Sequence, residues 1–502
     1  MLLSKSNLKN IAGSSLQMPE GALLDLPEKV VQFGTGVLLR ALPDYFIDKA
    51  NRCGIFNGRI VVVKSTGGGD TSDFDKQDCL YTLCMRGVFD GRPVQENVIC
   101  SSVSRVLSAA TSWGAVLECA HNPAISIVIS NTTEVGIELV KENIHGTPPS
   151  SYPAKLLAFL YERFKAFDGS EKSGLVIIPT ELISDNGDKL KSIVHELAQW
   201  NQLDKAFIEW LSTTNHFCNS LVDRIVPGKP AEPVKAALEK ELGYTDELMI
   251  MSEVYSLWAI EGNEYVKSVL SFAPADAGVV IADNITMFKE LKLRLLNGTH
   301  TLSCGVAFLA GITTVREAMT NKLLRQFIQQ LMTKEIAVAI PFPLSEKDAL
   351  DFSAKVLDRF SNPSIEHQWI SITLNYTAKL KMRVVPVLQR YYGQYKMVPE
   401  NIATGFAAWL LFMKSVKKEA DNYFGEHNGK LYPVKDEMAP YFFDLWQHSS
   451  VDNLVKVVLS NTTLWDADLT LLEGLADSVA IKLHAIMQDS VMALINPAAS
   501  AQ

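Results

Sequence analysis

The sequence lacks the features of membrane, secreted and nucleic-acid-binding proteins. None of the apolar runs in its 502 residues approaches the roughly 20 apolar residues that a membrane-spanning helix needs. The longest of these runs, at 305–312 and 406–413, have the length of buried helix segments. The 47 basic residues are outnumbered by 56 acidic ones and form no long basic stripe, which disfavours nucleic acid as a partner. The composition predicts a soluble, folded protein and leaves an anionic small molecule open as its ligand.

Disulfide, zinc-binding and secretion patterns are also absent. The seven cysteines are scattered, odd in number and without a C-x-x-C pair, which is typical of a reducing compartment. Residues 1–21 lack the basic region, apolar stretch and cleavage site of a secretory signal. We therefore expect a cytoplasmic protein without disulfide bridges or zinc. Its oligomeric state is not predicted.

Hydrophobic periodicity divides the chain into two parts. The first part alternates helical stretches with short Val/Ile-rich runs, predicted as strands at 29–36, 58–65, 124–131 and 174–181. Such strands with helical crossovers imply a parallel sheet covered on both faces. From about residue 275 long helical periodicities take over, as at 349–360 and 475–487.

The fold prediction follows from this change of pattern. We predict an α/β Rossmann-like doubly wound domain over residues 20–274, followed by a mainly α-helical domain over residues 275–502. A segment rich in Ala, Pro and Gly, 271–278, marks the boundary.

The first predicted strand ends in a glycine motif. The stretch VVQFGTGVLLRA places Gly34 and Gly36 directly before a helical segment, where backbone amides can cradle a pyrophosphate. Leu39 occupies the third glycine position of the dinucleotide fingerprint, so an ordinary tight turn is the alternative. The strand context favours a dinucleotide site.

Polar residues follow two further predicted strands. Lys64 and Ser65 stand where an NAD-specific fold often has an acidic residue for the ribose, so Lys64 leaves NADP open. A solvated lysine at a strand end is an equal alternative. Asn131, Thr132 and Thr133 fall at the carboxyl edge of the sheet, where doubly wound folds bind ligands, although plain turns also carry such residues.

The stretch KLRLLNGTHT, residues 292–301, adds polar groups to leucines at helical spacing. At about 100° per residue, Lys292 and Asn297 can face the same cleft as His300. A partly desolvated lysine can exchange a proton with a substrate hydroxyl, an asparagine can donate to a developing alkoxide, and a histidine can orient a neighbouring hydroxyl. Gly298 would let a backbone or substrate approach. A surface lysine, a capping asparagine and a core histidine are the alternative, which spacing alone favours.

The same stretch resembles the K-x4-N-x2-H motif of the polyol-specific long-chain dehydrogenases, the mannitol dehydrogenase family. The resemblance runs from about residue 29 to beyond 390, and its segments fall in the order that this family shows: QFGTGVLLRA, QDCLYT, SNTTEVGI, PTELISDNG, NSLVDRIVP and SEVYSLWAIEG. Within the family, TELISDNG, LNGTHT, AGITTVREAM and NPSIEHQWISITLN are most similar to the members that interconvert tagaturonate and altronate.

The resemblance implies an NAD-linked dehydrogenase that needs no metal, with NADP not excluded. Lys292 would act as general acid and base, Asn297 and Asn186 would form the oxyanion hole, and His300 would orient the substrate. The residues that the resemblance and the glycine motif assign to the cofactor are Gly34, Gly36, Arg40, Asn131, Thr132 and Asp223.

Two positions depart from the mannitol-type pattern. Those enzymes place a glutamate three residues before the catalytic lysine, where this chain has Lys289 followed by Glu290, so a carboxylate proton gate is not carried over. They also place an arginine eight residues before a substrate-binding lysine. That lysine corresponds to Lys379, but Ser371 replaces the arginine.

A sugar-acid substrate needs a cation near its carboxylate. The candidates are Lys379, Lys381 and Arg383, with Lys379 first, because positions two apart do not share a helix face. A solvated basic face is the favoured alternative for Lys381 and Arg383.

We therefore predict a reductase that interconverts tagaturonate and altronate. The open alternatives are the same chemistry on fructuronate and mannonate, or on an uncharged polyol such as mannitol. A nucleotide-binding protein without catalysis is a further alternative, against which the intact trio of Lys292, Asn297 and His300 argues.

Overall fold

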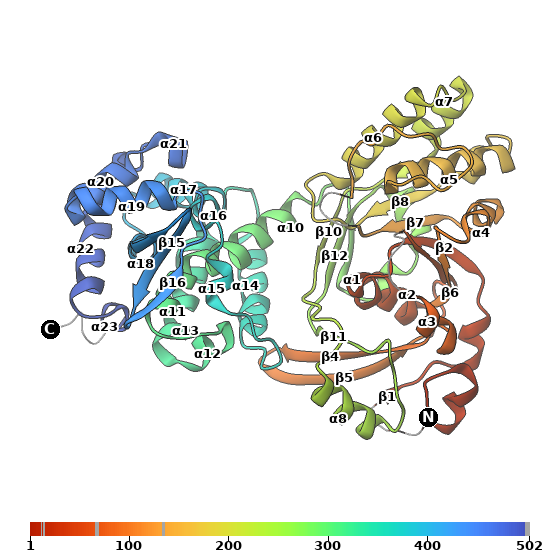
Figure 1. Ribbon diagram of the computed structural model, residues 1–502, viewed down its shortest axis with the longest axis horizontal. Helices are drawn as coiled ribbons and strands as arrows, with labels where there is room; N and C mark the ends of the chain where they lie inside the picture. The colour runs from red at the N-terminus through yellow and green to blue at the C-terminus, as the bar shows by residue number, and fades with distance from the viewer. Residues whose placement is uncertain (12, 14–15, 66–69, 133–135, 497–502) are drawn as a thin grey trace. The chain divides into compact units, whose positions relative to one another are not determined.

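The computed structural model describes all residues except 12, 14–15, 66–69, 133–135 and 497–502. The chain forms two compact units (Figure 1). Unit 1 comprises Met1–Arg86 and Pro93–Ile285, and unit 2 comprises Gly87–Arg92 and Thr286–Gln502. Residues 275–285 thus lie in unit 1, because strand β13 (Val279–Ala282) pairs with β12 (Leu257–Glu261) of that unit.

A six-stranded parallel sheet in the order β6-β3-β2-β7-β8-β9 forms the centre of unit 1. All four predicted strands are confirmed, and two more complete the sheet; their bounds are β2 (Glu28–Phe33), β3 (Arg59–Lys64), β6 (Val103–Ser108), β7 (Ile127–Ser130), β8 (Val176–Pro179) and β9 (His216–Phe217). The direction of strand succession reverses between β2 and β7. Ligands of doubly wound sheets bind at this kind of switch point, outside the carboxyl ends of the strands.

Alternate residues of the central strands enter two separate apolar cores. Val30 packs with Ile47 in one core, whereas Val31 packs with Leu156 and Leu190 in the other. The alternation follows from the two-residue period of a strand. Helices accordingly lie on both faces of the sheet (Figure 1). The helices of unit 1 are α1 (Val37–Ala41), α2 (Pro43–Arg52), α3 (Ser72–Lys76), α4 (Trp113–Glu118), α5 (Tyr152–Ala166), α6 (Asn186–Trp200), α7 (Lys205–Thr214), α8 (Glu232–Leu242) and α9 (Glu264–Val269).

Two smaller sheets in unit 1 were not predicted. One has the order β1-β5-β4-β11 and the other the order β10-β12-β13. Their remaining strands are β1 (Leu16–Gln17), β4 (Tyr81–Phe89), β5 (Arg92–Cys100), β10 (Ser220–Asp223) and β11 (Ile250–Glu253).

Unit 2 is mainly helical, so the predicted fold class is confirmed. Both helical periodicities and both long apolar runs fall within or largely within its helices, which are α10 (Thr286–Leu291), α11 (Thr299–Leu309), α12 (Val315–Thr320), α13 (Lys322–Gln330), α14 (Glu346–Phe360), α15 (Trp369–Ile372), α16 (Tyr376–Arg383), α17 (Val385–Tyr395), α18 (Glu400–Phe412), α19 (Ala439–His448), α20 (Val451–Leu459), α21 (Thr462–Trp465), α22 (Leu475–Gln488) and α23 (Val491–Leu494). Among the described residues, no helix combines the length and apolar character that crossing a membrane requires.

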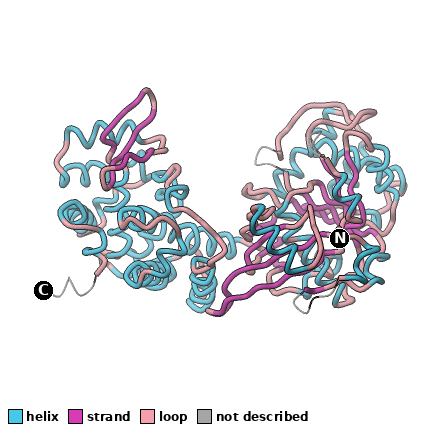
Figure 2. The backbone as a smooth tube through the Cα atoms, turned by 60° about the horizontal axis from the view of Figure 1, so that its bottom comes forward, coloured by secondary structure: helices cyan, strands magenta, loops and turns pink. Residues whose placement is uncertain are grey.

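Unit 2 also contains an antiparallel sheet that was not predicted. Figure 2 shows its strands in magenta among the helices; they are β14 (Ser415–Glu419), β15 (Asn422–His427) and β16 (Lys430–Pro433).

Candidate active site

A cavity of about 450 Å³ opens at the switch point of the unit 1 sheet. Gly34 and Gly36 line it after β2, and Asn131 and Thr132 line it after β7, so four of the predicted cofactor residues meet there. Lys64 lines it after β3. The predicted Thr133 lies outside the described residues.

The two glycines of the motif are needed for different reasons. Gly34 has φ +132°, and a Cβ there would lie 2.8 Å from the Asn131 carbonyl oxygen and 2.8 Å from Leu39 Cδ1. Leu39 stands in the place of the fingerprint's third glycine and packs against its first glycine, Gly34. A Cβ on Gly36 would meet nothing within 4 Å, because Gly36 faces the open cavity. Gly34 thus closes the turn, and Gly36 keeps room for a ligand.

A buried glutamate that the sequence analysis missed fixes the loop after β7. Glu181 Oε1 accepts hydrogen bonds from the Thr132 amide at 2.8 Å and its hydroxyl at 3.0 Å, and Oε2 accepts one from the Ser130 hydroxyl at 3.2 Å. Asn131 Nδ2 donates to the Thr180 carbonyl at 3.0 Å. Burial raises the pKa of Glu181. Its position directly after the neighbouring strand β8 was the signal that could have identified it.

The start of α5 supplies two further lining residues, Tyr152 and Lys155. Lys155 Nζ donates to the Ser150 carbonyl at 2.7 Å, and burial lowers the pKa of Lys155. The Tyr152 hydroxyl is buried and has no hydrogen-bond partner among the described residues. The Ser-x-Pro sequence at 151–153, a helix-start signal, could have placed both on a helix facing this edge.

Two predicted cofactor residues do not line the described part of the cavity. The Arg40 guanidinium donates to the Leu248 carbonyl at 2.7 Å and lies over the Tyr81 ring, 5.4 Å from its centroid. Asp223 is buried at the end of β10. Cofactor contacts of Arg40 and Asp223 stay predictions.

Asn186, at the start of α6, is buried and forms several hydrogen bonds. Its Nδ2 donates to the carbonyls of Pro179 at 3.1 Å, Glu181 at 3.0 Å and Ser220 at 3.1 Å, and its Oδ1 accepts from the Ser220 amide at 2.9 Å. The side chain is fully buried. These contacts join the start of α6 to the end of β8 and the start of β10. The oxyanion role of Asn186 stays a prediction.

In unit 2, the stretch from Lys292 to Gly298 is a π-helix between α10 and α11. The α-helical angles predicted for it are wrong, because a π-helix bonds each N–H to the carbonyl five residues before it. Lys292 and Asn297, five residues apart, are therefore one turn apart on the same side. Both are half-buried, whereas Leu295 and Leu296 between them are buried. The expected close approach to Gly298 is only ordinary contact, with the Arg383 carbonyl oxygen 3.7 Å from where its Cβ would be.

A buried arginine anchors this π-helix. Arg294 Nε donates to Glu290 Oε2 at 2.9 Å, and Nη1 donates to the carbonyls of Met382 at 2.5 Å and Arg383 at 3.0 Å. The Glu290 carboxylate is therefore engaged in an ion pair. The expectation that no carboxylate proton gate is carried over stays a prediction.

His300 is held as a neutral ring. It stacks on Phe360 with ring centroids 4.2 Å apart and meets His367 edge-on at 5.2 Å. Burial, followed by the charges of His367, Arg359 and Arg383, lowers the pKa of His300 well below its ordinary value. Its Nε2 is buried without a hydrogen-bond partner in the described part of the chain. A neutral imidazole in this position can hydrogen-bond a ligand.

Two of the three candidate cations share one face of α16. Lys379 Nζ donates to the Ile372 carbonyl at 2.9 Å, and Arg383, one turn later, donates to Thr301 Oγ1 at 3.0 Å. Burial lowers the pKa of both, and the Arg383 charge lowers that of Lys379 further. Lys381 instead pairs with Asp466 at 2.8 Å. Ser371 is exposed and donates to the Gln368 carbonyl at 2.7 Å.

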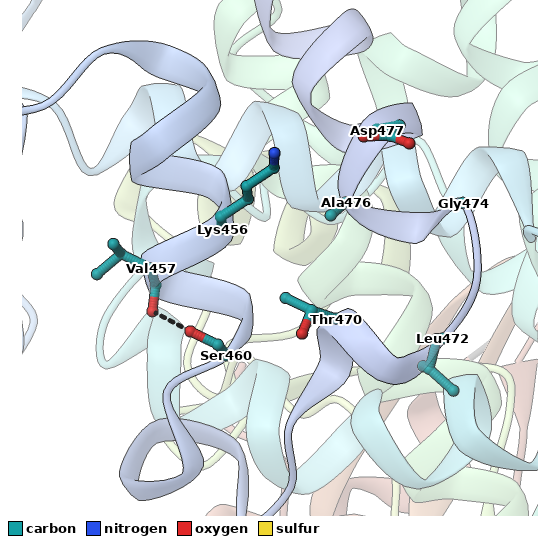
Figure 3. A pocket seen from close by; sticks show the side chains of 8 residues that line it. All are labelled: Lys456, Val457, Ser460, Thr470, Leu472, Gly474, Ala476 and Asp477. Atoms are coloured by element: carbon teal, nitrogen blue, oxygen red, sulfur yellow. Dashed lines mark hydrogen bonds between the residues drawn. The ribbon is translucent and has the colours of Figure 1, made fainter.

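A second cavity, of about 410 Å³, lies by α20 and α22 (Figure 3). Lys456 and Asp477 contribute its charged side chains. The Ser460 hydroxyl donates a hydrogen bond to the Val457 carbonyl at 3.3 Å. Among the described residues that line it, none was predicted to bind cofactor or substrate. We assign no function to this cavity.

A switch-point cavity on a doubly wound sheet, together with a helical unit that carries a half-buried lysine and asparagine, defines a dinucleotide-dependent dehydrogenase. Comparison with known proteins gives the family. The chain belongs to the mannitol dehydrogenase family: the mannitol dehydrogenase Rossmann domain matches residues 28–272 and the mannitol dehydrogenase C-terminal domain matches residues 284–487. The predicted family and enzyme class are confirmed.

Curated relatives match nearly the whole chain. Altronate oxidoreductase of Bacillus subtilis (strain 168) is 37% identical over 464 residues, which cover 92% of this chain and 93% of the relative. Altronate oxidoreductase of Escherichia coli O7:K1 (strain IAI39 / ExPEC) is 37% identical over 480 residues, covering 94% and 97%.

Solved structures share the fold. Pseudomonas fluorescens mannitol 2-dehydrogenase, in a ternary complex with NAD and D-mannitol, has 22% identity and a TM-score of 0.67, covering 100% of both chains. A substrate-free D-sorbitol dehydrogenase has 20% identity and a TM-score of 0.78, covering 99% of this chain and 100% of its own.

Proposed function

We propose that the protein is an NAD-dependent oxidoreductase that interconverts D-tagaturonate and D-altronate. The structural observation that carries the substrate class is Arg383, a half-buried cation one turn after Lys379 on the same face of α16. Mannitol-type enzymes also have a lysine at the position of Lys379, so the argument rests on the second cation: an uncharged polyol offers Arg383 no countercharge, whereas a sugar acid offers a carboxylate. The near full-length similarity to altronate oxidoreductases supports the same substrate.

The residues of unit 1 fit a dinucleotide. The turn that Gly34 closes and the space that Gly36 leaves open suit a pyrophosphate at the end of β2. NAD, when bound, supplies the hydride acceptor or donor. Lys64, at the end of β3, leaves some binding of NADP open, and the family assignment favours NAD.

The residues of unit 2 carry the proton chemistry. Lys292 takes the proton of the altronate hydroxyl during oxidation and returns it to the ketone oxygen during reduction. Asn297, one π-helical turn away, donates a hydrogen bond to the same oxygen as its charge develops. His300, neutral and buried, orients a neighbouring substrate hydroxyl, and Lys379 with Arg383 holds the carboxylate.

A substrate panel tests this proposal. Purified enzyme is assayed by NADH oxidation with D-tagaturonate, D-fructuronate and D-fructose in parallel, and then with NADPH. We expect D-tagaturonate with NADH to give the highest kcat/KM. A higher value for fructuronate would reassign the sugar acid, a higher value for fructose would refute the carboxylate site, and no turnover of any substrate would refute the enzyme.

We also propose that the enzyme works in the cytosol. All seven cysteines are free, and six of them are buried. Unpaired cysteines on this scale are typical of a reducing compartment. Cell fractionation followed by detection of the protein tests this, and recovery in a secreted fraction would contradict it.

A further inference from the structure

The carboxylate-binding candidate Arg383 is held at both ends by the segment that carries the catalytic lysine. At its side chain, Nη1 donates to Thr301 Oγ1 at 3.0 Å. At its main chain, the carbonyl accepts a hydrogen bond from Arg294 Nη1 at 3.0 Å. Thr301 Oγ1 itself donates to the Asn297 carbonyl at 2.8 Å. One hydroxyl thus connects Arg383 to the π-helical turn.

The guanidinium of Arg383 has a hydrogen-bond donor that no described residue fills. This donor is Nε, which is buried, whereas Nη1 donates to the neutral hydroxyl of Thr301. Its charge lowers the pKa of both His300 and Lys379, so it acts on the groups expected to face the substrate. A planar guanidinium fork matches a carboxylate in two parallel hydrogen bonds, provided that its orientation is fixed.

We propose that Thr301 and Arg294 are positioning residues that fix Arg383 as the carboxylate receptor, and that they thereby set the preference for sugar acids over neutral sugars. The inference rests on the proposed function. Thr301 fixes the plane of the guanidinium, and Arg294 fixes the end of α16 from which it projects. Since both tethers start on the π-helix and α11, the carboxylate is held in register with Lys292 and Asn297.

The test compares kcat/KM for D-tagaturonate with kcat/KM for D-tagatose, its uncharged counterpart. Thr301→Val keeps the shape of a fully buried side chain and removes both hydrogen bonds. We expect the tagaturonate-to-tagatose ratio to fall roughly tenfold to a hundredfold, the range for hydrogen bonds to charged groups. Thr301→Ser keeps the hydroxyl and should restore most of the ratio.

Thr299→Val is the matched control. Thr299 is also fully buried on α11, but its hydroxyl has no hydrogen-bond partner in the described structure, so this variant should keep the wild-type ratio. Arg294→Lys provides a second test if Thr301→Val does not fold. The lysine keeps a positive charge to pair with Glu290 but cannot donate to both the Met382 and the Arg383 carbonyls. The tagaturonate-to-tagatose ratio should therefore fall in this variant as well.

The outcomes separate this inference from the proposed function. If the wild-type enzyme does not reduce D-tagaturonate, the proposed function fails. If it does, but Thr301→Val and Arg294→Lys lower kcat/KM equally for D-tagaturonate and D-tagatose, the two residues are only structural and the inference is overturned. Where tagatose turnover is too slow to measure, inhibition of tagaturonate reduction by D-altronate and by uncharged D-altritol gives the same comparison.

Discussion

The candidate binding sites of the two units are formed by different kinds of chemical groups. Unit 1 builds its cavity around glycine backbone, small polar side chains and a loop fixed by buried Glu181, with Lys64, Tyr152 and Lys155 at its wall. Unit 2 instead collects cationic and amide side chains on α16, α11 and a π-helix. A backbone cradle suits a ligand that is the same in many enzymes. Projecting side chains suit the part of the reaction that differs between substrates. Mutations should therefore divide by unit, with turnover and selectivity lost in unit 2 and cofactor affinity or folding lost in unit 1.

The largest effect is expected for Lys292→Ala in unit 2. Loss of the acid–base group should lower kcat by about 10²–10⁴-fold. The Kd for NADH should hardly change, because the role proposed for Lys292 is proton transfer to and from the substrate. Stopped-flow reduction and NADH fluorescence titration measure the two quantities. Lys289→Ala, on the preceding turn, is the control and should keep wild-type turnover; full activity of Lys292→Ala would remove the residue from the mechanism.

The second prediction compares the two asparagines assigned to the oxyanion. Asn297→Ala should raise the barrier by about 2.7–4 kcal/mol with little change in thermal stability, as for a lost oxyanion donor. Asn186→Ala should instead lower the Tm, because each buried group left without its hydrogen bond costs about 1–3 kcal/mol. Steady-state kinetics and thermal melts on both variants check this. A change in KM alone for Asn297→Ala would mean that the residue only binds substrate.

The third prediction separates the two glycines of unit 1. Gly34→Ala should destabilise unit 1 by about 1–3 kcal/mol, because of its backbone conformation and the close Asn131 carbonyl. Gly36→Ala should fold normally and bind NADH more weakly, because its methyl group enters the cavity. Melting curves and NADH titrations distinguish the two. Normal NADH affinity in Gly36→Ala would place the pyrophosphate elsewhere.

The last prediction concerns the pH dependence of unit 1. Burial raises the pKa of Asp44 from 3.8 to about 8, so the folded state binds a proton that the unfolded state has lost. Its contribution to stability is complete below pH about 4 and is lost as the pH rises through about 8. Asp44→Asn keeps the neutral form at every pH. The Tm difference between variant and wild type should grow from pH 5 to pH 8, and a constant difference would show that Asp44 is already ionised.

The structure could be predicted from the sequence where a short local pattern of residues determines it. The parallel strands were predictable because burial on both faces leaves continuous Val/Ile runs, and the glycine motif marked the cavity. The sheet β14–β16 was missed because most of its residues are exposed, among them Lys417 and Lys418, and its strands carry no continuous apolar run. Glu181 was missed because its partners, Ser130 and Thr132, are distant in sequence.

The π-helix shows a different kind of failure. An α-helical period of 3.6 residues was assumed for residues 292–301, although the five-residue spacing of Lys292 and Asn297 is the hydrogen-bond spacing of a π-helix. The contacts of Arg383 with Thr301 and Arg294 join segments more than eighty residues apart, and no local pattern encodes them. Tertiary packing therefore decided the details of the substrate site.

The most direct test of the account is a crystal structure of the enzyme with NAD and D-altronate. We predict that Lys292 Nζ and Asn297 Nδ2 lie within about 3 Å of the reacting oxygen, and that Arg383 forms two hydrogen bonds to the carboxylate. A complex in which Lys292 is remote from that oxygen, or in which the carboxylate binds away from α16, would contradict it.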